Sequence, residues 1–411
     1  MDIKELRQSN ELLDLFCTLA EIPSPSLKEE QVTIKIKEFC TSNGIECSSD
    51  DYGNVYINIP PTDENKAPLM FSAHMDVVGD TSPVNLILDG EYIKADSRTL
   101  GADDKAGVAP ILYLAKEISA DKTLKHGGFE AVFTRDEELN MSGIKHVDFS
   151  KIRSKYVLVC DADKLGQIQI AGAGYTNAKL EVRALKGGHS GIDIGDKTRL
   201  NAAKLISEIL AEFPQGVYYE DETGVVTSCN LGAVIGGGVQ NAVKSLIDDK
   251  INSGDYITEI INRSATNIIN TDAKASYSIR SSNGQKEDEL KKIMTDIVGK
   301  FNKKYEGLAE SAVSFEVHLP PFEKSSEDYI PKLHTKVCQK LGLKNEVSSF
   351  HAGAETHIYA HNKNSKGEVF MPYLLGLADV YNMHSAREKV QYKTILSGYD
   401  IIRGLFKEFN S

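Results

Sequence analysis

Strand-like apolar runs in the first part of the chain end, one after another, in histidine or acidic residues. Leu69 to Ala73 runs into His74, Phe129 to Thr134 precedes an Arg-Asp-Glu-Glu segment, and Tyr156 to Cys160 runs into Asp161. Helix-like segments separate these runs, which is the rhythm of an α/β sheet. Open α/β sheets bind their ligands beyond the carboxyl ends of the strands. The sequence therefore predicts an α/β fold with a site at that edge of the sheet.

From about Thr176 the order of predicted elements changes. A strand, a helix, a Gly-rich turn, a strand, a charged helix and a strand follow, at residues 178–185, 199–213, 236–238, 273–280, 286–305 and 312–318. This order is typical of a two-layer α+β domain of the ferredoxin-like kind. Pro320-Pro321 marks its exit. Because 411 residues exceed one ordinary core, we expect a larger domain of residues 1–175 and 320–411, with residues 176–319 inserted into it.

Composition excludes several classes of partner. A net charge of −12 without clustered Lys and Arg argues against nucleic acid. A run of about 18 apolar residues, which a membrane span needs, is not found, so we expect no membrane partner. The first residues lack the basic start and apolar run of a signal peptide, and the six cysteines show no Cys-x-x-Cys pairing. We therefore expect a cytoplasmic protein with reduced thiols.

The short motifs that carry histidine and acidic residues each have a plain structural explanation when taken alone. In an extended strand His74 and Asp76 face one way, so Asp76 could orient His74, but the two could equally form a satisfied surface pair. The acidic turn at 101–107 fits helix capping. The carboxylates in 135–138 fit a solvated loop, although such a cluster repels itself unless cations neutralise it. His384 alone fits a hydrogen-bonded structural residue.

The combination of these motifs points to a metal site. Histidine and carboxylate side chains at successive strand ends supply the nitrogen and oxygen ligands that are typical of zinc. One shared carboxylate can bridge two ions. The candidate ligands are His74, Asp103, Glu138, Asp161 and His384.

The motifs also occur in the order found in a known family. His74-Met75-Asp76, the 101–107 turn, Glu137-Glu138, Asp161, the Gly-Gly-His-Ser-Gly segment at 187–191 and the His384 segment follow one another along nearly the whole chain. In this the sequence resembles the two-zinc peptidase family that holds peptidase T, carboxypeptidase G, aminoacylase and the aminoacyl-histidine dipeptidases. The resemblance implies a catalytic three-layer αβα domain with a mixed sheet. It also implies that the inserted α+β domain serves as a lid and dimerisation domain.

The resemblance assigns roles to the candidate residues. One metal would be held by His74 and Asp161 and a second by Glu138 and His384, with Asp103 bridging both. Glu137 would be the general base, taking a proton from the attacking water and passing it to the leaving amine. Asp76 would be a further catalytic residue, which orients His74. The cofactors implied are two Zn²⁺ ions per subunit, for which Mn²⁺ or Co²⁺ could substitute.

His189, in the inserted domain, is implied to reach the oxyanion of the reaction, commonly across a dimer. The alternative is a flexible Gly-rich turn that carries an incidental histidine. Because the family residue acts across a dimer and the inserted domain serves dimerisation, the resemblance implies a homodimer.

Substrate-binding residues are less sharply defined. Arg280 resembles the family arginine that grips a substrate carboxylate, with a surface salt bridge as the alternative. Asn267 has the family spacing before this arginine, but Asn241 fits the pattern after the Gly-Gly pair, and the stretch between them looks like an insertion. His351 and Glu355 resemble the aminoacyl-histidine dipeptidases instead, and Glu355 is our candidate for binding the free amino end.

We therefore expect a zinc-dependent aminopeptidase whose partners are short peptides and which cleaves the N-terminal bond of tripeptides or dipeptides. An amidohydrolase that removes the acyl group from N-acyl amino acids would use the same centre. A non-catalytic peptide-binding or metal-storage homologue is the alternative from another class, but it would not be expected to keep both Glu137 and all the candidate ligands.

Overall fold

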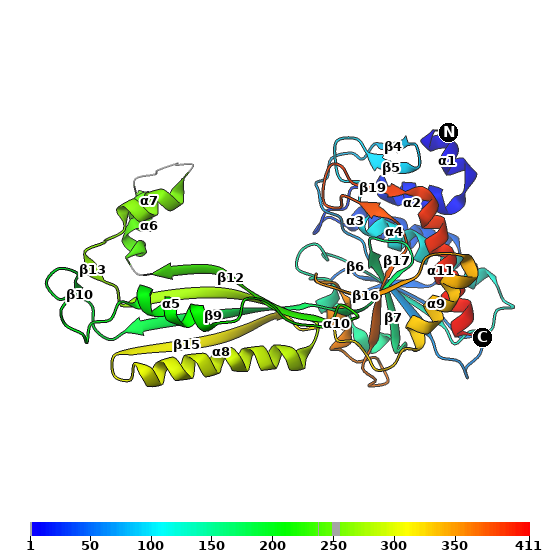
Figure 1. Cartoon of the computed structure of the whole chain (residues 1–411). Helices are drawn as coiled ribbons and strands as arrows, with labels where there is room; N and C mark the ends of the chain where they lie inside the picture. The colour runs from blue at the N-terminus through cyan, green and yellow to red at the C-terminus, as the bar shows by residue number, and fades with distance from the viewer. Residues whose placement is uncertain (1, 237, 249–254) are drawn as a thin grey trace. The chain divides into compact units, whose positions relative to one another are not determined.

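The computed structural model describes residues 2–236, 238–248 and 255–411, which form two compact units. The first unit comprises Met1–Gly172 and Phe322–Ser411, and the second comprises Ala173–Pro321. Figure 1 shows the helices and strands of both units and labels many of them.

An eight-stranded mixed sheet forms the centre of the first unit. Strand β3 lies parallel to β6 and β7, and β7 lies parallel to β17, whereas β2 and β8 pair antiparallel with β6 and β17. The spatial order is β1 (Cys47–Ser49), β2 (Val55–Ile59), β6 (Phe129–Thr134), β3 (Leu69–His74), β7 (Tyr156–Ala162), β17 (Met371–Gly376), β8 (Gln167–Gly172) and β16 (Glu346–Phe350).

Helices cover both faces of this sheet. On one face, α4 packs against β3 and β7 and also against α2 and α11. On the other face, α10 packs against β17, and the 3₁₀ turns η1 and η2 contribute to the same apolar cluster, the second one of this unit. The helices of the unit are α1 (Ile3–Ser9), α2 (Glu11–Ala20), α3 (Glu30–Ser42), α4 (Ala102–Ala120), η1 (Ile144–His146), η2 (Phe149–Lys151), α9 (Tyr329–Leu341), α10 (Thr356–Ala360) and α11 (Tyr392–Phe409).

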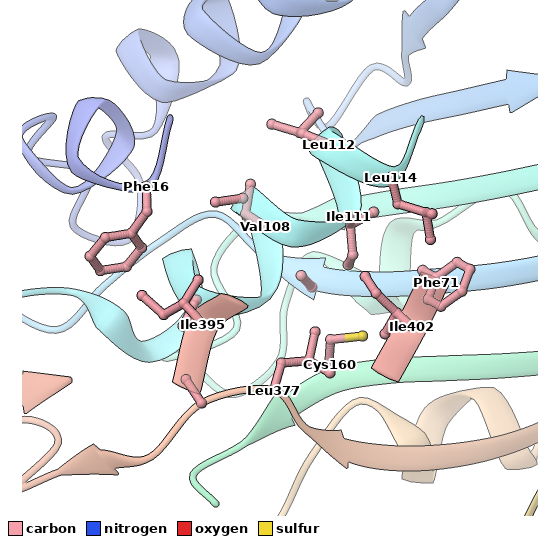
Figure 2. Close-up of a cluster of buried hydrophobic side chains, with 14 of the residues drawn as sticks. Phe16, Phe71, Val108, Ile111, Leu112, Leu114, Cys160, Leu377, Ile395 and Ile402 are labelled. Atoms are coloured by element: carbon pink, nitrogen blue, oxygen red, sulfur yellow. The ribbon is translucent and has the colours of Figure 1, made fainter. Parts of the chain in front are cut away.

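Alternating side chains of the central strands fill the two cores. Phe71 and Leu158 belong to the core that α4 covers, while their neighbours Met70 and Val157 belong to the core on the α10 side. Figure 2 shows the first core, in which apolar side chains of α4 meet Phe71 and residues of α11. Each fully buried side chain of this kind contributes about 1.5–3 kcal/mol. The strands therefore cannot slip in register without exposing one set of apolar groups.

A small antiparallel sheet lies beside the main sheet of the first unit. It joins β4 (Leu86–Asp89) and β5 (Tyr92–Ala95) to β18 (Val380–Tyr381) and β19 (Lys389–Gln391). Residues 382–388 connect β18 to β19. The segment that carries His384 is therefore anchored at both of its ends.

The second unit is a five-stranded antiparallel sheet with helices packed on it. Its order is β11 (Gly216–Glu220), β12 (Val226–Gly236), β14 (Asp272–Ser281), β9 (Gly174–Ala184) and β15 (Ala309–Leu319). Helices α5 (Ala202–Glu212) and α8 (Gly284–Lys304) pack against β9, β14 and β15. Short strands β10 (Gly188–His189) and β13 (Ile268–Ile269) pair separately.

These arrangements confirm the predicted fold class, an α/β unit with a mixed sheet and an inserted ferredoxin-like α+β unit. Strand β6 begins and ends at the predicted residues, and the other predicted elements differ by a few residues at their ends. Within the second unit two helices were not predicted, α6 (Val239–Asp248) and α7 (Tyr256–Arg263), which lie between β12 and β13. Of the predicted Gly-rich turn, Gly236 ends β12 and Gly237 lies outside the described residues.

A search of the described helices finds none with the length and hydropathy that crossing a membrane requires.

His334 makes the stability of the first unit pH-dependent. It is fully buried in α9, its Nδ1 lies 2.8 Å from Asn345 Oδ1, and burial lowers its pKa to about 4. The unfolded chain binds the proton near pH 6.5, so the stabilising contribution is present above that pH and is lost as the pH falls toward 4. We expect this loss to reach about 3 kcal/mol.

Urea unfolding at pH 7 and pH 4.5 measures the effect. The His334→Gln variant should lose much less stability than the wild type between these two pH values. An equal pH dependence in both proteins would contradict the assignment.

Candidate metal centre

Three adjacent parallel strands bring the predicted ligands to one edge of the main sheet. His74 is the last residue of β3, Asp161 lies near the end of β7, and Glu137 and Glu138 follow β6. Because β6, β3 and β7 are neighbours and run in the same direction, their carboxyl ends meet. Asp103 joins them from the first turn of α4, which packs against β3.

The carboxylate of Asp103 lies between two histidines. His74 Nε2 is 3.0 Å from Asp103 Oδ1 and 3.5 Å from Asp161 Oδ1. His384 Nε2 is 3.0 Å from Asp103 Oδ2 and 2.9 Å from Glu138 Oε1. The structure thus groups His74 with Asp161, and His384 with Glu138, on the two oxygens of one shared carboxylate.

Burial gives these carboxylates strongly shifted pKa values. Burial, reinforced by the charge of Asp103, raises the pKa of Asp161 to about 6 although His74 opposes the shift. Burial likewise raises the pKa of Glu138 to about 7, and that of Glu137 well above its usual range. The pKa of Asp103 is instead lowered, because its hydrogen bonds to His384 and His74 outweigh its burial. The carboxylates of such a cluster stay ionised together only if nearby positive charge compensates their repulsion.

The donor set fits divalent cations. Ligand atoms lie within 4.8 Å of one another in three overlapping groups, namely His74 with Asp104 and Asp161, His74 with Glu137 and Glu138, and Asp103 with Glu138 and His384. The buried Glu138 Oε1 makes no hydrogen bond of good geometry, although His384 Nε2 lies 2.9 Å from it. Imidazole nitrogens and carboxylate oxygens without a thiolate suit Zn²⁺, Mn²⁺ or Co²⁺. The residues present therefore fit one or two such ions.

Asp76 connects His74 to the two glutamates. Its Oδ1 lies 3.3 Å from His74 Nδ1 and accepts a hydrogen bond of 2.9 Å from the Glu137 backbone N–H. Its Oδ2 accepts from the Glu138 N–H at 3.1 Å and from Ser26 Oγ at 2.7 Å. Asp76 is fully buried. One carboxylate therefore fixes the ring of His74 and the backbone of both glutamates.

Several supporting residues went unrecognised in the sequence. Glu388 accepts hydrogen bonds from the backbone N–H groups of residues 101–103, at 2.8–3.3 Å, and so holds the turn that carries Asp103. Lys105 is fully buried and donates to Ser24 Oγ and to the Met75 carbonyl. Asp104 accepts from the N–H of Gly107 and of His74. Asp104 and Lys105 lie in the 101–107 turn and Glu388 lies four residues after His384, so their only sequence signal was proximity to a ligand.

The two predicted residues that follow β16, His351 and Glu355, differ from each other in burial. Glu355 is buried, its Oε2 accepts from Ser72 Oγ at 3.2 Å, and its Oε1 has no hydrogen-bond donor. Burial raises its pKa to about 7, and its charge contributes to the raised pKa of Glu137. His351 is exposed in the loop before α10. Only Glu355 therefore acts electrostatically on the cluster.

The remaining predicted residues belong to the second unit. His189 in β10 is exposed, and its Nδ1 accepts from the Gly191 N–H at 3.0 Å. Asn267 lies beside it, because its carbonyl accepts from the Ser190 N–H at 2.9 Å. Arg280 in β14 places its guanidinium 4.5 Å from the ring centre of Tyr175. The side chain of Asn241, in α6, lies outside the described part of the chain.

A mixed α/β sheet that ends in such a cluster is the framework of a metal-dependent hydrolase. The chain belongs to Peptidase family M20/M25/M40, whose sequence pattern matches residues 70–408. It is 32% identical over 230 residues to the cytosol non-specific dipeptidase of Escherichia coli, a match that covers 49% of this chain and 46% of that protein. Peptidase T of Clostridium novyi is 23% identical over 80% of this chain and 82% of its own length.

Solved structures share the fold. The aminopeptidase PepT of Bacillus cereus superimposes with a TM-score of 0.77 at 21% identity, covering 97% of this chain and 98% of that one. The family assignment makes the chain a hydrolase of the metallopeptidase class.

Because Asp103 contacts both histidines, its removal should weaken both halves of the cluster. We expect wild-type protein dialysed against Zn²⁺ and then buffer to retain about two ions per chain, and Asp103→Ala to retain fewer than one. Inductively coupled plasma mass spectrometry measures the content. Asp89→Asn, at an exposed residue paired with Lys94, is the control and should match the wild type. Full metal retention by Asp103→Ala would refute the shared role.

Proposed function

We propose that this protein is a zinc-dependent exopeptidase that removes the N-terminal residue of tripeptides or dipeptides. The observation that carries the proposal is a single carboxylate, Asp103, shared between His74 and His384 beside the half-buried Glu137. Membership of a peptidase family supports it. The dipeptidase and peptidase T relatives support short peptides as the substrate class.

The proposed ligands divide into two sets. His74 and Asp161 would hold one ion, Glu138 and His384 would hold the other, and Asp103 would contact both. We propose Zn²⁺ because the set combines imidazole and carboxylate donors, with Mn²⁺ and Co²⁺ as substitutes.

Glu137 is the proposed general base. Ions bound at such a site acidify water and polarise a substrate carbonyl. The Glu137 carboxylate would take the proton of the attacking water and deliver it to the leaving amine. Burial raises the pKa of Glu137, and a raised pKa makes its carboxylate a better proton acceptor. Asp76 holds the Glu137 backbone in place for this transfer.

Residues of the second unit are proposed to bind the substrate. Arg280 stacks on Tyr175, which is itself stacked on His318 with ring centres 5.3 Å apart. No carboxylate pairs with Arg280 among the described residues, so its guanidinium is available for the carboxylate of a peptide. His189 is proposed as the oxyanion donor, with Asn267 beside it.

Substrate register is proposed to depend on the segment after β16. Glu355 is 1% exposed, so we propose that it acts through its charge on Glu137 rather than by touching the free amine. His351 is exposed and free to approach the peptide.

We further propose a cytoplasmic homodimer. The cytosolic dipeptidase relative supports this location. Exposed apolar side chains in the second unit support self-association, notably Ile192, Ile194, Ile257 and Ile261. Sedimentation at micromolar concentration tests the dimer.

Replacing the base should separate chemistry from metal binding. We expect Glu137→Gln to keep the wild-type zinc content while kcat for Ala-Ala-Ala falls about 100- to 10,000-fold, because Gln cannot take the proton. Wild-type activity toward Ala-Ala, Ala-Ala-Ala and an Xaa-His dipeptide should disappear with a chelator. Release of product only from N-acetyl-Ala would identify a deacylase, and unchanged turnover by Glu137→Gln would refute the mechanism.

Replacing Arg280 should affect only peptides with a free carboxylate. We expect Arg280→Ala to lower kcat/KM for Ala-Ala-Ala by roughly 10- to 100-fold, because a charge-assisted bidentate contact is lost. The C-terminal amide of the same peptide should be hydrolysed equally by variant and wild type. Arg183→Ala, at an exposed position of the neighbouring strand β9, is the control. Equal losses for acid and amide would argue against this contact.

A further inference from the structure

The loop that carries Glu137 and Glu138 has a backbone that needs support. After β6 it takes positive φ angles at Asp136 (53°), Asn140 (59°) and Met141 (51°), none of them glycine. Residues with side chains adopt this region at a cost, and they keep it only where surrounding contacts hold it. The contacts that hold this loop therefore determine where the two glutamates point.

Glu29, just before α3, holds the first two residues of the loop. Its side chain is 0% exposed. Oε2 accepts hydrogen bonds from Arg135 Nε at 3.0 Å and from Arg135 Nη2 at 2.6 Å. Oε1 accepts from the Asp136 backbone N–H at 3.0 Å. One buried carboxylate thus fixes both a side chain and the backbone immediately before Glu137.

Asp136 extends the connection. Its side chain is buried, with Oδ1 accepting from the Leu27 N–H at 2.5 Å and Oδ2 accepting from the Tyr52 hydroxyl at 2.9 Å. The Tyr52 ring stacks on His146, with ring centres 4.0 Å apart and planes 3° from parallel. Glu29 before α3 accepts a hydrogen bond from the loop after β6, and Asp136 of that loop accepts one from Leu27 before α3. The two segments are therefore joined by hydrogen bonds of both senses.

This cluster is a hydrogen-bonded clamp rather than another ion site. Ligand atoms of Glu29, Asp76 and Asp136 lie within 4.8 Å of one another. Each carboxylate already accepts hydrogen bonds from its neighbours, and the Arg135 guanidinium supplies positive charge. The oxygens of the three carboxylates are thus used in hydrogen bonds that hold the loop, so we do not assign a metal ion to this cluster.

We propose that Glu29 is a positioning residue for Glu137 and Glu138, acting through Arg135 and Asp136. This inference rests on the proposed role of Glu137 as the base. A base displaced by about 1 Å can lose on the order of 100-fold in rate without any loss of substrate binding. The signature of Glu29 is therefore a loss of kcat at nearly constant KM.

The chain provides a matched control in the next residue. Glu30 has a side chain that is 62% exposed, and its Oε1 lies 3.7 Å from the same Arg135 Nη2. We expect Glu29→Gln to lower kcat for Ala-Ala-Ala by about tenfold or more, with KM within about threefold of the wild type. Glu30→Gln should change neither value by more than about twofold.

Hydrogen–deuterium exchange measures how firmly the loop after β6 is held, independently of enzyme activity. The Glu137 and Glu138 N–H groups are bonded to Asp76, so their exchange reports whether the loop stays in place. We expect Glu29→Gln to speed exchange at residues 135–142 by about tenfold while the strands of the main sheet keep wild-type rates. Tyr52→Phe, which removes one hydrogen bond to Asp136, should give the same local pattern more weakly and serves if Glu29→Gln fails to fold.

The outcomes are distinguishable. Unchanged exchange at 135–142 together with unchanged kcat overturns the proposal. Faster exchange throughout the unit with full kcat per folded molecule also overturns it, because that result describes a general stabilising role. If the wild type hydrolyses none of the peptides, the proposed function fails, and local loop exchange in Glu29→Gln still decides whether Glu29 positions the glutamates.

Discussion

Largely buried carboxylates from β7, from the loop after β6 and from the start of α4 meet at one edge of the main sheet, where they repel one another. His74 and His384 lie against the two oxygens of Asp103 at 3.0 Å and oppose part of that repulsion. Packing apolar side chains alone would never bring such groups together, since burial penalises each charge. The cluster is kept in place by the sheet and by hydrogen bonds that surround it, and its ligand atoms fit cations that would balance its charge.

The surrounding hydrogen bonds come from segments distant in the chain. Glu388 holds the turn at 101–103, Asp76 holds the backbone of Glu137 and Glu138, and Glu29 holds the residues just before them. Each is itself a buried carboxylate accepting backbone N–H groups. The negative charge of the supporting residues therefore makes nearby cations more favourable. Their hydrogen bonds restrict the directions in which the ligand side chains can point.

Much of the site could be predicted because its residues stand at the ends of recognisable strands. Leu69 to His74 and Phe129 to Thr134 are apolar runs that can only be buried strands, so the polar residues after them had to lie at one edge. Glu388 and Glu29 could not be predicted, since a glutamate that caps a distant turn has no periodicity of its own. Helices α6 and α7 were missed because the stretch between Asn241 and Asn267 was interpreted as an insertion, although its apolar residues recur at helical spacing.

The sequence by itself determined the α/β and ferredoxin-like units, the candidate ligands and the family resemblance, because these depend on local periodicity and on the order of short motifs. Only the tertiary structure decided that Asp103 faces both histidines and that Glu29 and Asp76 hold the loop that carries Glu137. Those contacts join residues separated by 29 to 281 positions. Such pairings are fixed by the packing of strands and helices in three dimensions, which no local pattern encodes.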